Sequence, residues 1–467
     1  MEQMHEIKQF ILQYIQENCE IYFDMARRIW EKPELGMEEH FASKLLADFL
    51  ENQGFSVERA AAGMPTAFVA TWGEGKPVIG FSMEYDALPG LSQKAQWQQE
   101  PVRCGAPGHG CSHNLLGVGG AMAAVAFKNA AEKFGLHCTI KAFGTPAEEL
   151  CIGKPAMGNA GYFRGLDCVL DWHPSALTDA SYRKCPAYFS VKYHYHGRTS
   201  HGNSPWHGRS ALDGAQLQAH AIEMLREHIL PGPGPQAANT MNYTFSDTGP
   251  EFPSVVPDRA TLWCIGRFET SAQLADALAR VDNTARGAAL ATGTSVEIEY
   301  LAASHEQLPN ETLQRVLQSN LELLGDVEFT AEEQEFVMQM QRQTGQDCWW
   351  MEAPVPFGFK YAFVTDSSEY SWEAPYAILE VNLGPGPAWH NWMVTACSGT
   401  SHGNKCMQKG AEILAAAAVD VVTDSALLEA CKAEWRERLG GREYHSLLPE
   451  GTPIPLEISK ETMAKYR

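Results

Sequence analysis

The sequence predicts an α/β fold in which a mostly parallel, mixed sheet is flanked by helices and carries an inserted ferredoxin-like βαββαβ domain. Three observations support this prediction. Continuous apolar runs such as Val78–Met83 and Thr139–Gly144 are typical of strands buried on both faces. These runs alternate with helical patterns up to about residue 184, as a mostly parallel sheet requires. Over residues 185–302 the order becomes strand, helix, strand, strand, helix, strand.

The first part of the chain begins with two predicted helices. Residues 6–30 carry apolar side chains at helical spacing, and the segment Pro33–Gly36 ends that helix. A second amphipathic helix contains Phe41, Leu46 and Leu50. Residues 115–134 form a third predicted helix, and its many Gly and Ala residues allow it to pack closely against a sheet.

Polar side chains follow three predicted strands directly. Asp86 comes after Val78–Met83, Glu148 and Glu149 come after the next strand, and His173 ends the strand that starts at Cys168. In open α/β sheets, ligands bind beyond the carboxyl ends of the strands. We therefore expect these side chains to converge.

The inserted domain is predicted to begin near residue 185 and to end near residue 302. Its predicted elements are a strand over 188–196, a helix over 209–228, strands over 239–246 and 260–268, a helix over 271–291 and a strand over 295–301. Helices resume at Leu308, further strands are predicted over 357–364 and 377–383, and an Ala-rich helix over 403–421. The expected parts are a first catalytic part (1–184), the inserted domain (185–302) and a second catalytic part (303–467).

Length and charge restrict the class of protein. The chain has 467 residues, enough for two domains with a large core. Its formal net charge of -21 argues against nucleic acids and anionic membranes as partners. No apolar run reaches the length of a transmembrane helix, and the polar start Met1–Glu6 does not resemble a signal peptide. We therefore expect a cytoplasmic protein, in which the 12 cysteines stay thiols unless they serve as ligands or nucleophiles.

Cys111 and His113 lie two residues apart in the Gly-rich turn at 108–117. A thiolate and an imidazole at this spacing can bind one metal ion such as Zn2+. The pair alone is a weak signal, because free cysteines often pack as small buried apolar residues. Three downstream candidates favour a metal site: Glu149, His173 and His390.

These five candidate ligands suit a pair of divalent ions, Zn2+ or Mn2+, with a water molecule between them. Neighbouring residues of an extended chain point to opposite sides. If Glu149 binds metal, Glu148 therefore points the other way and can face the water as general base. The alternative for the Glu148–Glu149 pair is a solvated helix start.

Six segments are weak signals singly and a strong signal in this order. They are Trp30–Gly36, Glu84–Leu88, Gly110–Asn114, Pro146–Glu149, Trp172–Pro174 and Trp389–His390. In these segments the chain resembles the M20 metallopeptidase and amidohydrolase family, in the branch with a Cys-x-His metal motif that includes p-aminobenzoyl-glutamate hydrolases. The resemblance covers nearly the whole chain. It implies the same five metal ligands and places the base, Glu148, before the ligand, Glu149.

The resemblance also implies that the inserted domain is a lid that mediates dimerisation. The segment Gly197–Ala211 matches a family motif whose histidine, here His201, reaches the partner subunit's active site and helps to hold the oxyanion. A histidine in a surface loop is the alternative. Arg267 resembles a residue that binds the substrate carboxylate, which suits a bidentate guanidinium. The implied partners are a small substrate with a free carboxylate and a second copy of the chain.

Three positions depart from the family pattern. Ser112 replaces the usual Gly of the metal motif, which affects the local turn. Ser254–Val255 stands where relatives have Asn-Val, and Glu369–Ser371 stands where many relatives have Glu-Asp-Phe. These changes leave the metal ligands intact and bear on the identity of the substrate.

The predicted function is a metal-dependent amidohydrolase that cleaves N-acyl or N-aroyl amino acids such as aminobenzoyl-glutamate. The alternatives are a dipeptidase of the same family and a non-catalytic metal-binding assembly subunit, and the sequence leaves room for a heteromeric partner subunit. A structural Cys/His zinc protein fits less well, because no second close Cys/His pair accompanies Cys111 and His113. Trp172, Trp389 and Trp392 are compatible with an aromatic acyl pocket and equally with the core.

Overall fold

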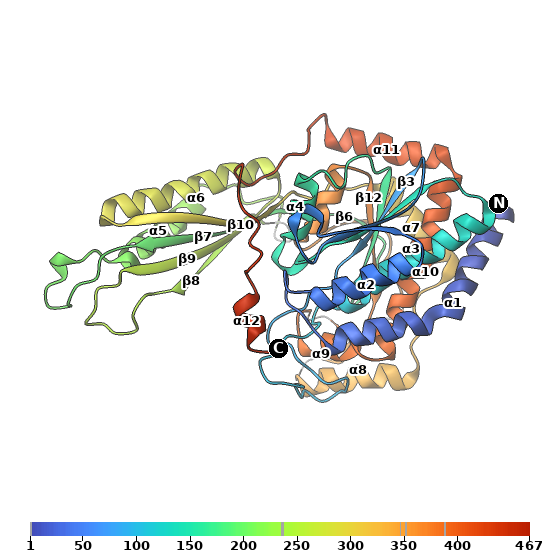
Figure 1. Ribbon diagram of the computed structural model, residues 1–467, viewed down its shortest axis with the longest axis horizontal. Helices are drawn as coiled ribbons and strands as arrows, with labels where there is room; N and C mark the ends of the chain where they lie inside the picture. The colour runs from blue at the N-terminus through green and yellow to red at the C-terminus, as the bar shows by residue number, and fades with distance from the viewer. Residues whose placement is uncertain (1, 235–237, 346, 351–352, 387–388) are drawn as a thin grey trace.

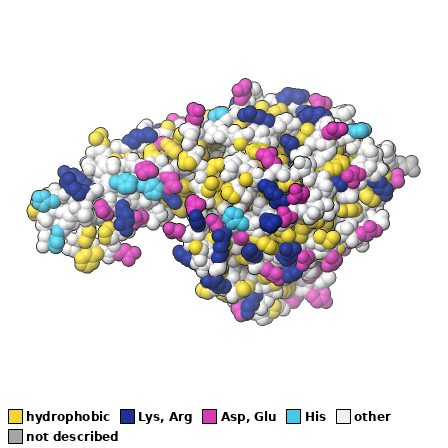
Figure 2. Space-filling view, viewed as in Figure 1, with side chains coloured by type: hydrophobic (Ala, Val, Ile, Leu, Met, Phe, Trp, Pro, Cys, Tyr) yellow, Lys and Arg dark blue, Asp and Glu magenta, His cyan; other side chains and the backbone are white. Residues whose placement is uncertain are grey.

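The computed structural model describes residues 2–234, 238–345, 347–350, 353–386 and 389–467, which form a larger and a smaller body (Figure 1). The larger body contains a six-stranded sheet and most of the helices. The smaller body contains residues 187–304 and projects to the left in Figure 1. On the face shown in Figure 2, acidic and basic side chains are interspersed over both bodies. No helix among the described residues is long and apolar enough to cross a membrane.

The sheet of the larger body is mixed and mostly parallel, as predicted. Its strands, in chain order, are β1 (Ser56–Arg59), β2 (Phe68–Gly73), β3 (Val78–Met83), β4 (Thr139–Gly144), β5 (Cys168–Ser175) and β12 (Tyr376–Asn382). Their spatial order is β1-β2-β4-β3-β5-β12. Strands β4, β3, β5 and β12 are parallel, whereas β2 is antiparallel to both β4 and β1. Strand β2 was not predicted from the sequence.

One strand prediction was wrong in its placement. Of the predicted strand over 357–364, only β11 (Phe359–Tyr361) forms, and it pairs with β6 (Tyr182–Lys184) in a separate two-stranded sheet. Pro356 and Gly358 lie just before β11. Because Pro has no N–H to donate, strands beside a Pro are usually found at sheet edges.

Helices flank the large sheet, and most of its core residues form one apolar cluster. The helices of this body are α1 (Glu2–Glu31), α2 (His40–Asn52), α3 (His113–Phe134), α4 (Gly153–Asn159), α7 (Glu311–Leu324), α8 (Ala331–Gln343), α9 (Trp392–Ser398), α10 (Ser401–Thr423), α11 (Ser425–Leu439) and α12 (Lys460–Ala464). Helix α3 approaches the sheet closely because its glycines have no side chain. A Cβ at Gly119 would lie 2.5 Å from the Trp172 ring, and a Cβ at Gly120 would lie 2.3 Å from the Ser82 carbonyl oxygen.

The smaller body has the predicted βαββαβ order. Its elements are β7 (Ala187–His196), α5 (Ala211–Arg226), β8 (Thr240–Asp247), β9 (Arg259–Phe268), α6 (Ser271–Thr292) and β10 (Ser295–Ser304). The antiparallel sheet has the order β10-β7-β9-β8, which places β10 and β8 at its edges. Residues such as Leu262 and Cys264 are buried with α5 and α6 in a separate apolar cluster. One face of this sheet is therefore covered by helices.

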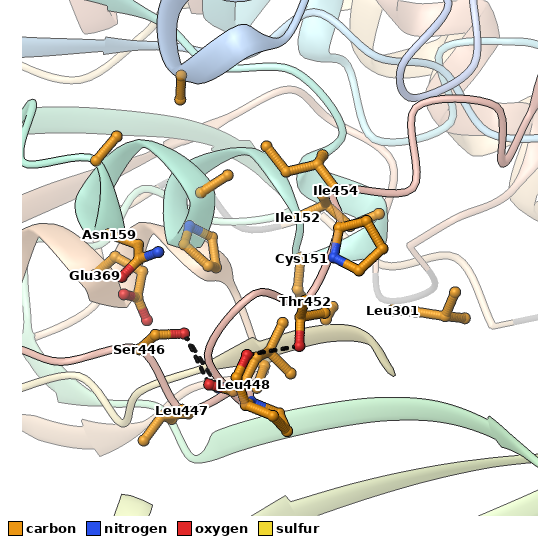
Figure 3. Close-up of a pocket in the computed structure, with 18 of the residues that line it drawn as sticks. Cys151, Ile152, Asn159, Leu301, Glu369, Ser446, Leu447, Leu448, Thr452 and Ile454 are labelled. Atoms are coloured by element: carbon orange, nitrogen blue, oxygen red, sulfur yellow. Dashed lines mark hydrogen bonds between the residues drawn. The ribbon is translucent and has the colours of Figure 1, made fainter. Parts of the chain in front are cut away.

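The chain after α11 passes between the two bodies before it reaches α12 (Figure 1). Leu447 and Leu448 pack against the apolar cluster of the smaller body, and Ile454 and Leu456 pack against a cluster of the larger one. Beside this segment is a cavity of about 480 Å³ whose wall includes Cys151, Glu369 and Ser446 (Figure 3). None of the site residues predicted from the sequence lines that cavity.

Candidate metal centre and active site

The carboxyl ends of three neighbouring strands supply most of the candidate site. Glu84 and Asp86 follow β3, Glu149 follows β4, and His173 lies near the end of β5. His113 is the first residue of α3, and the turn that precedes it contains Cys111. His390 lies shortly before α9. Parallel strands end at the same edge of a sheet, so this topology brings side chains that are far apart in the sequence together.

The five predicted ligands lie close enough to share metal ions. Cys111, His113 and His173 form one group whose ligand atoms lie within 4.8 Å of one another, and Cys111, Glu149 and His390 form another. The Cys111 Sγ is 3.5 Å from Nε2 of His173. The Glu149 Oε2 is 3.6 Å from Nε2 of His390. Cys111 belongs to both groups and would be available to a metal ion bound in either one.

Glu148 belongs to a further group around His113. Its Oε2 is 3.8 Å from Nε2 of His113, and the Glu84 Oε2 is 3.5 Å from the same nitrogen. Glu84, His113 and Glu148 thus form a third group with metal-ligand spacing.

Asp86 orients two of the candidate ligands, a role that was not assigned from the sequence. Its Oδ1 is 2.8 Å from Nδ1 of His113, and its Oδ2 accepts a hydrogen bond of 3.0 Å from the Glu149 backbone N–H. A carboxylate on the second nitrogen of a histidine fixes the tautomer and leaves the first nitrogen's lone pair for a metal. The sequence contained a signal for this role, because Asp86 is one of the polar residues that follow predicted strand ends.

A buried lysine network supports the floor of the site. The Lys154 Nζ lies 2.6 Å from Glu84 Oε1 and 2.5 Å from Asp366 Oδ1, and none of the three residues is more than 2% exposed. Ser367 Oγ donates a hydrogen bond of 3.0 Å to Glu84 Oε1. The network therefore fixes one oxygen of Glu84 and leaves the other for His113. Sequence reasoning missed Lys154, since α4 has no recognisable motif.

Unpaired polar atoms indicate that the site fits a cation. Within the described residues, His113 Nε2, Glu84 Oε2 and Glu149 Oε1 are buried and have no hydrogen-bond partner. An unpaired buried polar atom is costly, and here a nitrogen lone pair faces carboxylate oxygens. A cation in the group of Glu84, His113 and Glu148 would satisfy the first two atoms, whereas Glu149 belongs to a separate group with Cys111 and His390. The thiolate, imidazole and carboxylate donors suit a borderline metal such as Zn2+, and Mn2+ also accepts carboxylate and imidazole ligands.

Burial changes the proton affinities of the site in the absence of a metal. Desolvation, with a contribution from the nearby Glu84, raises the pKa of Glu148 to about 7. Desolvation likewise raises the pKa of Glu149 to about 8, and it lowers the pKa of His173 to about 4. Burial thus moves the pKa of Glu148 toward the range that suits a general base.

The Glu148–Glu149 pair lies in a 3-10 turn, η2 (Glu148–Leu150), and not on an extended chain. The geometric reason given from the sequence for their opposite directions was therefore wrong. The neighbours of the turn, Ala147 and Cys151, both have left-handed backbone conformations, with φ of 56° and 55°. Such conformations are strained for residues with a Cβ and often mark functional sites. The turn is what directs the two carboxylates to different neighbours.

Ser112, the departure from the family's Gly, also has a left-handed backbone, with φ of 65°. Glycine adopts this conformation without strain, whereas serine does so at a cost. The Ser112 Oγ lies 2.7 Å from the Ser398 Oγ. This contact links the turn before α3 that contains Cys111, here called the metal turn, to α9. The turn therefore keeps the shape that presents Cys111 and His113.

His201 and Arg267 lie on the smaller body, and neither belongs to the groups that the five candidate ligands form. His201 is exposed in the loop after β7, and its Nδ1 accepts a hydrogen bond of 3.0 Å from the Asn203 backbone N–H. Arg267 is near the end of β9; its guanidinium lies 5.8 Å from the Tyr188 ring centre and donates to Asn242 Oδ1 at 3.4 Å. Among the described residues, no carboxylate lies within ion-pair distance of Arg267, and the nearby Glu269 pairs with Lys184.

The three tryptophans that the sequence left open have different surroundings. Trp172 is fully buried, between Gly119 of α3 and Gly410 of α10, and is a core residue. The Trp389 ring lies 6.3 Å from the His173 ring, so this side chain borders the candidate ligands. Trp392 packs against the main apolar cluster.

Comparisons with known proteins agree with this geometry. The family model described as peptidase family M20/M25/M40 matches residues 80–420. One of the p-aminobenzoyl-glutamate hydrolase subunits of Escherichia coli (strain K12) is 33% identical over 97% of this chain and 100% of that protein. The Xaa-Arg dipeptidase of Homo sapiens is 28% identical over 92% of each chain. A dinuclear metal-binding peptidase from the M20 family of Bacillus subtilis shares the fold, with a TM-score of 0.54 at 15% identity over 87% of this chain and 99% of that chain.

Proposed function

We propose a substrate class and a mechanism on the premise that this chain belongs to peptidase family M20/M25/M40 and is a metal-dependent amidohydrolase. The substrate class is an N-acyl or N-aroyl amino acid with a free carboxylate, for which aminobenzoyl-glutamate is the first example to test. The observation that carries the proposal is the convergence of Cys111, His113, Glu149, His173 and His390 next to the carboxyl of Glu148.

These five residues would hold the metal ions, and Asp86 holds His113 in the tautomer that leaves its Nε2 available. Two divalent ions, Zn2+ or Mn2+, would supply Lewis acidity toward the amide carbonyl and acidify a water molecule at this site. His390, whose side chain is 54% exposed, is the most accessible of the five ligands. Substrate therefore enters from the side of His390.

Glu148 is the general base. It accepts a proton from the attacking water and delivers that proton to the leaving amine as the amide bond breaks. The buried Lys154–Glu84 pair lies close to it and stays fixed, so the polar surroundings of its carboxylate stay constant. Arg267 binds the carboxylate of the amino acid, since its guanidinium has no acidic partner among the described residues.

His201 serves the other subunit of a homodimer. Strand β7 has 10 residues and so spans about 30 Å between the larger body and the loop that contains His201. This loop lies on the part of the smaller body that projects away from the larger one (Figure 1). In the partner's active site, His201 donates a hydrogen bond to the oxyanion of the tetrahedral intermediate.

Two surfaces of the smaller body support dimerisation through it. Strand β8 is a sheet edge, which offers unpaired backbone groups to a second copy. Helix α5 carries exposed Leu217 and Met224, which are 40% and 71% exposed and lie seven residues apart on one helix face. A two-fold axis near these elements would pair each surface with itself.

The decisive experiment is an assay of the purified chain, loaded with Zn2+ or Mn2+, against p-aminobenzoyl-glutamate, N-acetyl-glutamate and an Xaa-Arg dipeptide. We expect hydrolysis of the acyl-glutamates and a strong loss of kcat in Glu148→Gln, whose metal content should be unchanged. Preference for the dipeptide would favour a dipeptidase, consistent with the relative of that name.

The assay also tests whether the chain acts alone. Two relatives from Escherichia coli are named as different subunits of a p-aminobenzoyl-glutamate hydrolase. Inactivity of the metal-loaded chain by itself would therefore indicate a heteromeric partner subunit instead of a homodimer. Activity of the purified chain would show that no such partner is required.

A further inference from the structure

The sheet of the smaller body has one face that its helices do not cover. Along β9, Trp263, Ile265 and Arg267 alternate with the buried residues Leu262, Cys264 and Gly266. Because side chains alternate across a strand, these three residues project from the uncovered face. The paired residues of β7 and β8 put Ser190 and Asn242 beside Ile265 on the same face.

A pocket of about 410 Å³ lies between this face and the candidate metal centre. Glu149 lies on its wall, so the pocket is continuous with the metal-binding residues. Most of the remaining wall is apolar: Leu150, Tyr188, Trp263, Ile265, Leu301 and Ile458. A concave, mostly apolar site of this size with a few polar groups is typical of a pocket for a small organic group. The Ile458 side chain comes from the segment that passes between the two bodies.

Trp263 is held in one orientation by two neighbours. Its Nε1–H donates a hydrogen bond of 2.8 Å to Ser190 Oγ, and the Lys192 Nζ lies 4.8 Å from the centre of its ring. An indole that is fixed in this way offers a flat apolar surface with little entropy left to lose on binding. Trp263 is only partly buried, so part of that surface is free.

Arg267 stands at the other end of the same row. It lies four residue steps along β9 from Trp263, or about 13 Å. The row thus presents a cation at one end and an aromatic surface at the other, with the metal-binding Glu149 on the wall of the same pocket as Trp263. An N-aroyl amino acid has the matching pattern: a carboxylate, a central amide and an aromatic ring.

We infer that this pocket is the acyl-group subsite and that Trp263 selects aromatic over small acyl groups. The inference rests on the proposed function, because it assumes that the cleaved amide lies at the metal centre. It assigns the acyl selectivity to the smaller body and not to Trp172, which is buried in the core.

The test compares N-benzoyl-glutamate with N-acetyl-glutamate, which share the amino acid and differ only in the acyl group. The readout is the ratio of kcat/KM for the benzoyl over the acetyl substrate. The Kd of N-benzoyl-glutamate is measured by calorimetry in the Glu148→Gln background, in which turnover is lost. We expect Trp263→Ala to lower this ratio about tenfold and to weaken binding by a similar factor. Trp263→Phe keeps a ring and should retain most of the ratio. Trp97→Ala, in a loop that does not line the pocket, is the matched control.

Three outcomes would overturn the inference. The first is an unchanged ratio and Kd in Trp263→Ala, and the second is an equal change in Trp97→Ala. The third is that Trp263→Ala changes the preference between N-acetyl-phenylalanine and N-acetyl-glutamate, which differ in the amino acid, instead of the preference between acyl groups. The last result would assign the pocket to the amino acid side chain. A wild-type chain that binds N-benzoyl-glutamate through Trp263 but does not hydrolyse it would support the pocket and contradict the proposed function. The two proposals can therefore fail separately.

Discussion

The two ring nitrogens of His113 have different environments. Nδ1 pairs with Asp86, whereas Nε2 faces Glu84 and Glu148 without a hydrogen bond among the described residues. His173 is arranged similarly, with Nδ1 at 2.5 Å from the Pro174 carbonyl oxygen and Nε2 toward Cys111. In both residues the protein fixes one ring nitrogen and leaves the other nitrogen to a metal ion, which is the usual arrangement of metal-binding histidines.

Cys111 is the proposed metal ligand whose loss should be most informative. Cys111 belongs to both of the groups that the five candidate ligands form. Cys111→Ala should therefore lower bound metal and abolish activity while the fold persists. Metal content by mass spectrometry and a thermal scan measure the two effects. Cys397→Ala removes a thiol that is equally buried but lies in α9 outside every candidate group, and it should keep its metal. Full metal content in Cys111→Ala would disprove the ligand assignment.

Asp86→Asn tests the orienting role of a residue outside the five proposed ligands. Removal of the carboxylate charge behind a metal-binding histidine typically weakens metal affinity about 10- to 100-fold. We expect that loss in a competition titration with a chelator. Asp282→Asn, which changes a buried carboxylate bonded to Tyr193 in the smaller body, should leave metal affinity unchanged. Equal affinities for the two variants would show that Asp86 does not orient His113.

The carboxyl pair predicts how stability depends on pH when no metal is bound. The pKa of Glu148 is raised to about 7 and that of Glu149 to about 8, so the folded chain keeps protons that the unfolded chain has lost. Their contribution to stability is full below about pH 4.5 and is lost as the pH rises through 7 and 8. The pKa of His173 is lowered to about 4, so its contribution to stability is lost only when the pH falls below about 6.5.

Between pH 6.5 and 8.5, the Tm of the chelator-treated chain should therefore fall. Added Zn2+ or Mn2+ should reduce the fall, because a cation then neutralises the charges in place of protons. Differential scanning fluorimetry at constant ionic strength measures both slopes. A metal-free Tm that rises over this range would contradict the raised pKa values.

At the scale of elements, the close contact of α3 with Trp172 positions the metal turn. Helix α3 begins at His113, so any displacement of the helix moves this proposed metal ligand. Gly119→Ala would bring a Cβ within 2.5 Å of the Trp172 ring, and overpacking of this kind typically costs about 1–3 kcal/mol. Chemical denaturation should show this loss, accompanied by weaker metal binding.

Gly287→Ala is the matched control for that substitution. Gly287 lies within α6, and a Cβ there would meet no atom within 4 Å. Alanine should therefore stabilise the chain by up to about 1 kcal/mol through helix propensity alone. Destabilisation of both variants to the same extent would show that the contact with Trp172 is not the cause.

At the scale of the whole molecule, the proposed exchange of His201 between subunits can be tested by complementation. His201→Ala and Glu148→Ala should each keep metal and fold but lose most of their activity, about 100- to 1,000-fold in kcat for the loss of one oxyanion donor. A heterodimer of the two has one site with both residues intact. If subunits mix at random in equal amounts, half of the dimers are mixed, so about a quarter of wild-type activity should return.

Subunit exchange must be shown independently, for example by mass spectrometry of one isotopically labelled variant. A mixture that exchanges subunits and stays inactive would show that His201 does not act in the partner's site. The variant Trp206→Ala, in the same loop, is the control for a general disturbance of the contact between subunits. Trp206 is exposed and has no assigned active-site role.

The sequence by itself determined most of the elements and the list of candidate ligands, but it revealed neither β2 nor the separate sheet to which β11 belongs. Apolar runs and their spacing are local properties, so the helices, the βαββαβ order and the polar residues after strand ends could be read without coordinates. The tertiary structure decided what depends on contacts between distant segments. It placed Asp86 on two ligands, revealed the buried Lys154–Glu84 pair, put Trp172 in the core and Trp263 on the pocket, and set the directions of Glu148 and Glu149 by a strained turn. These features have no local signature, because each is fixed by neighbours that only folding brings close.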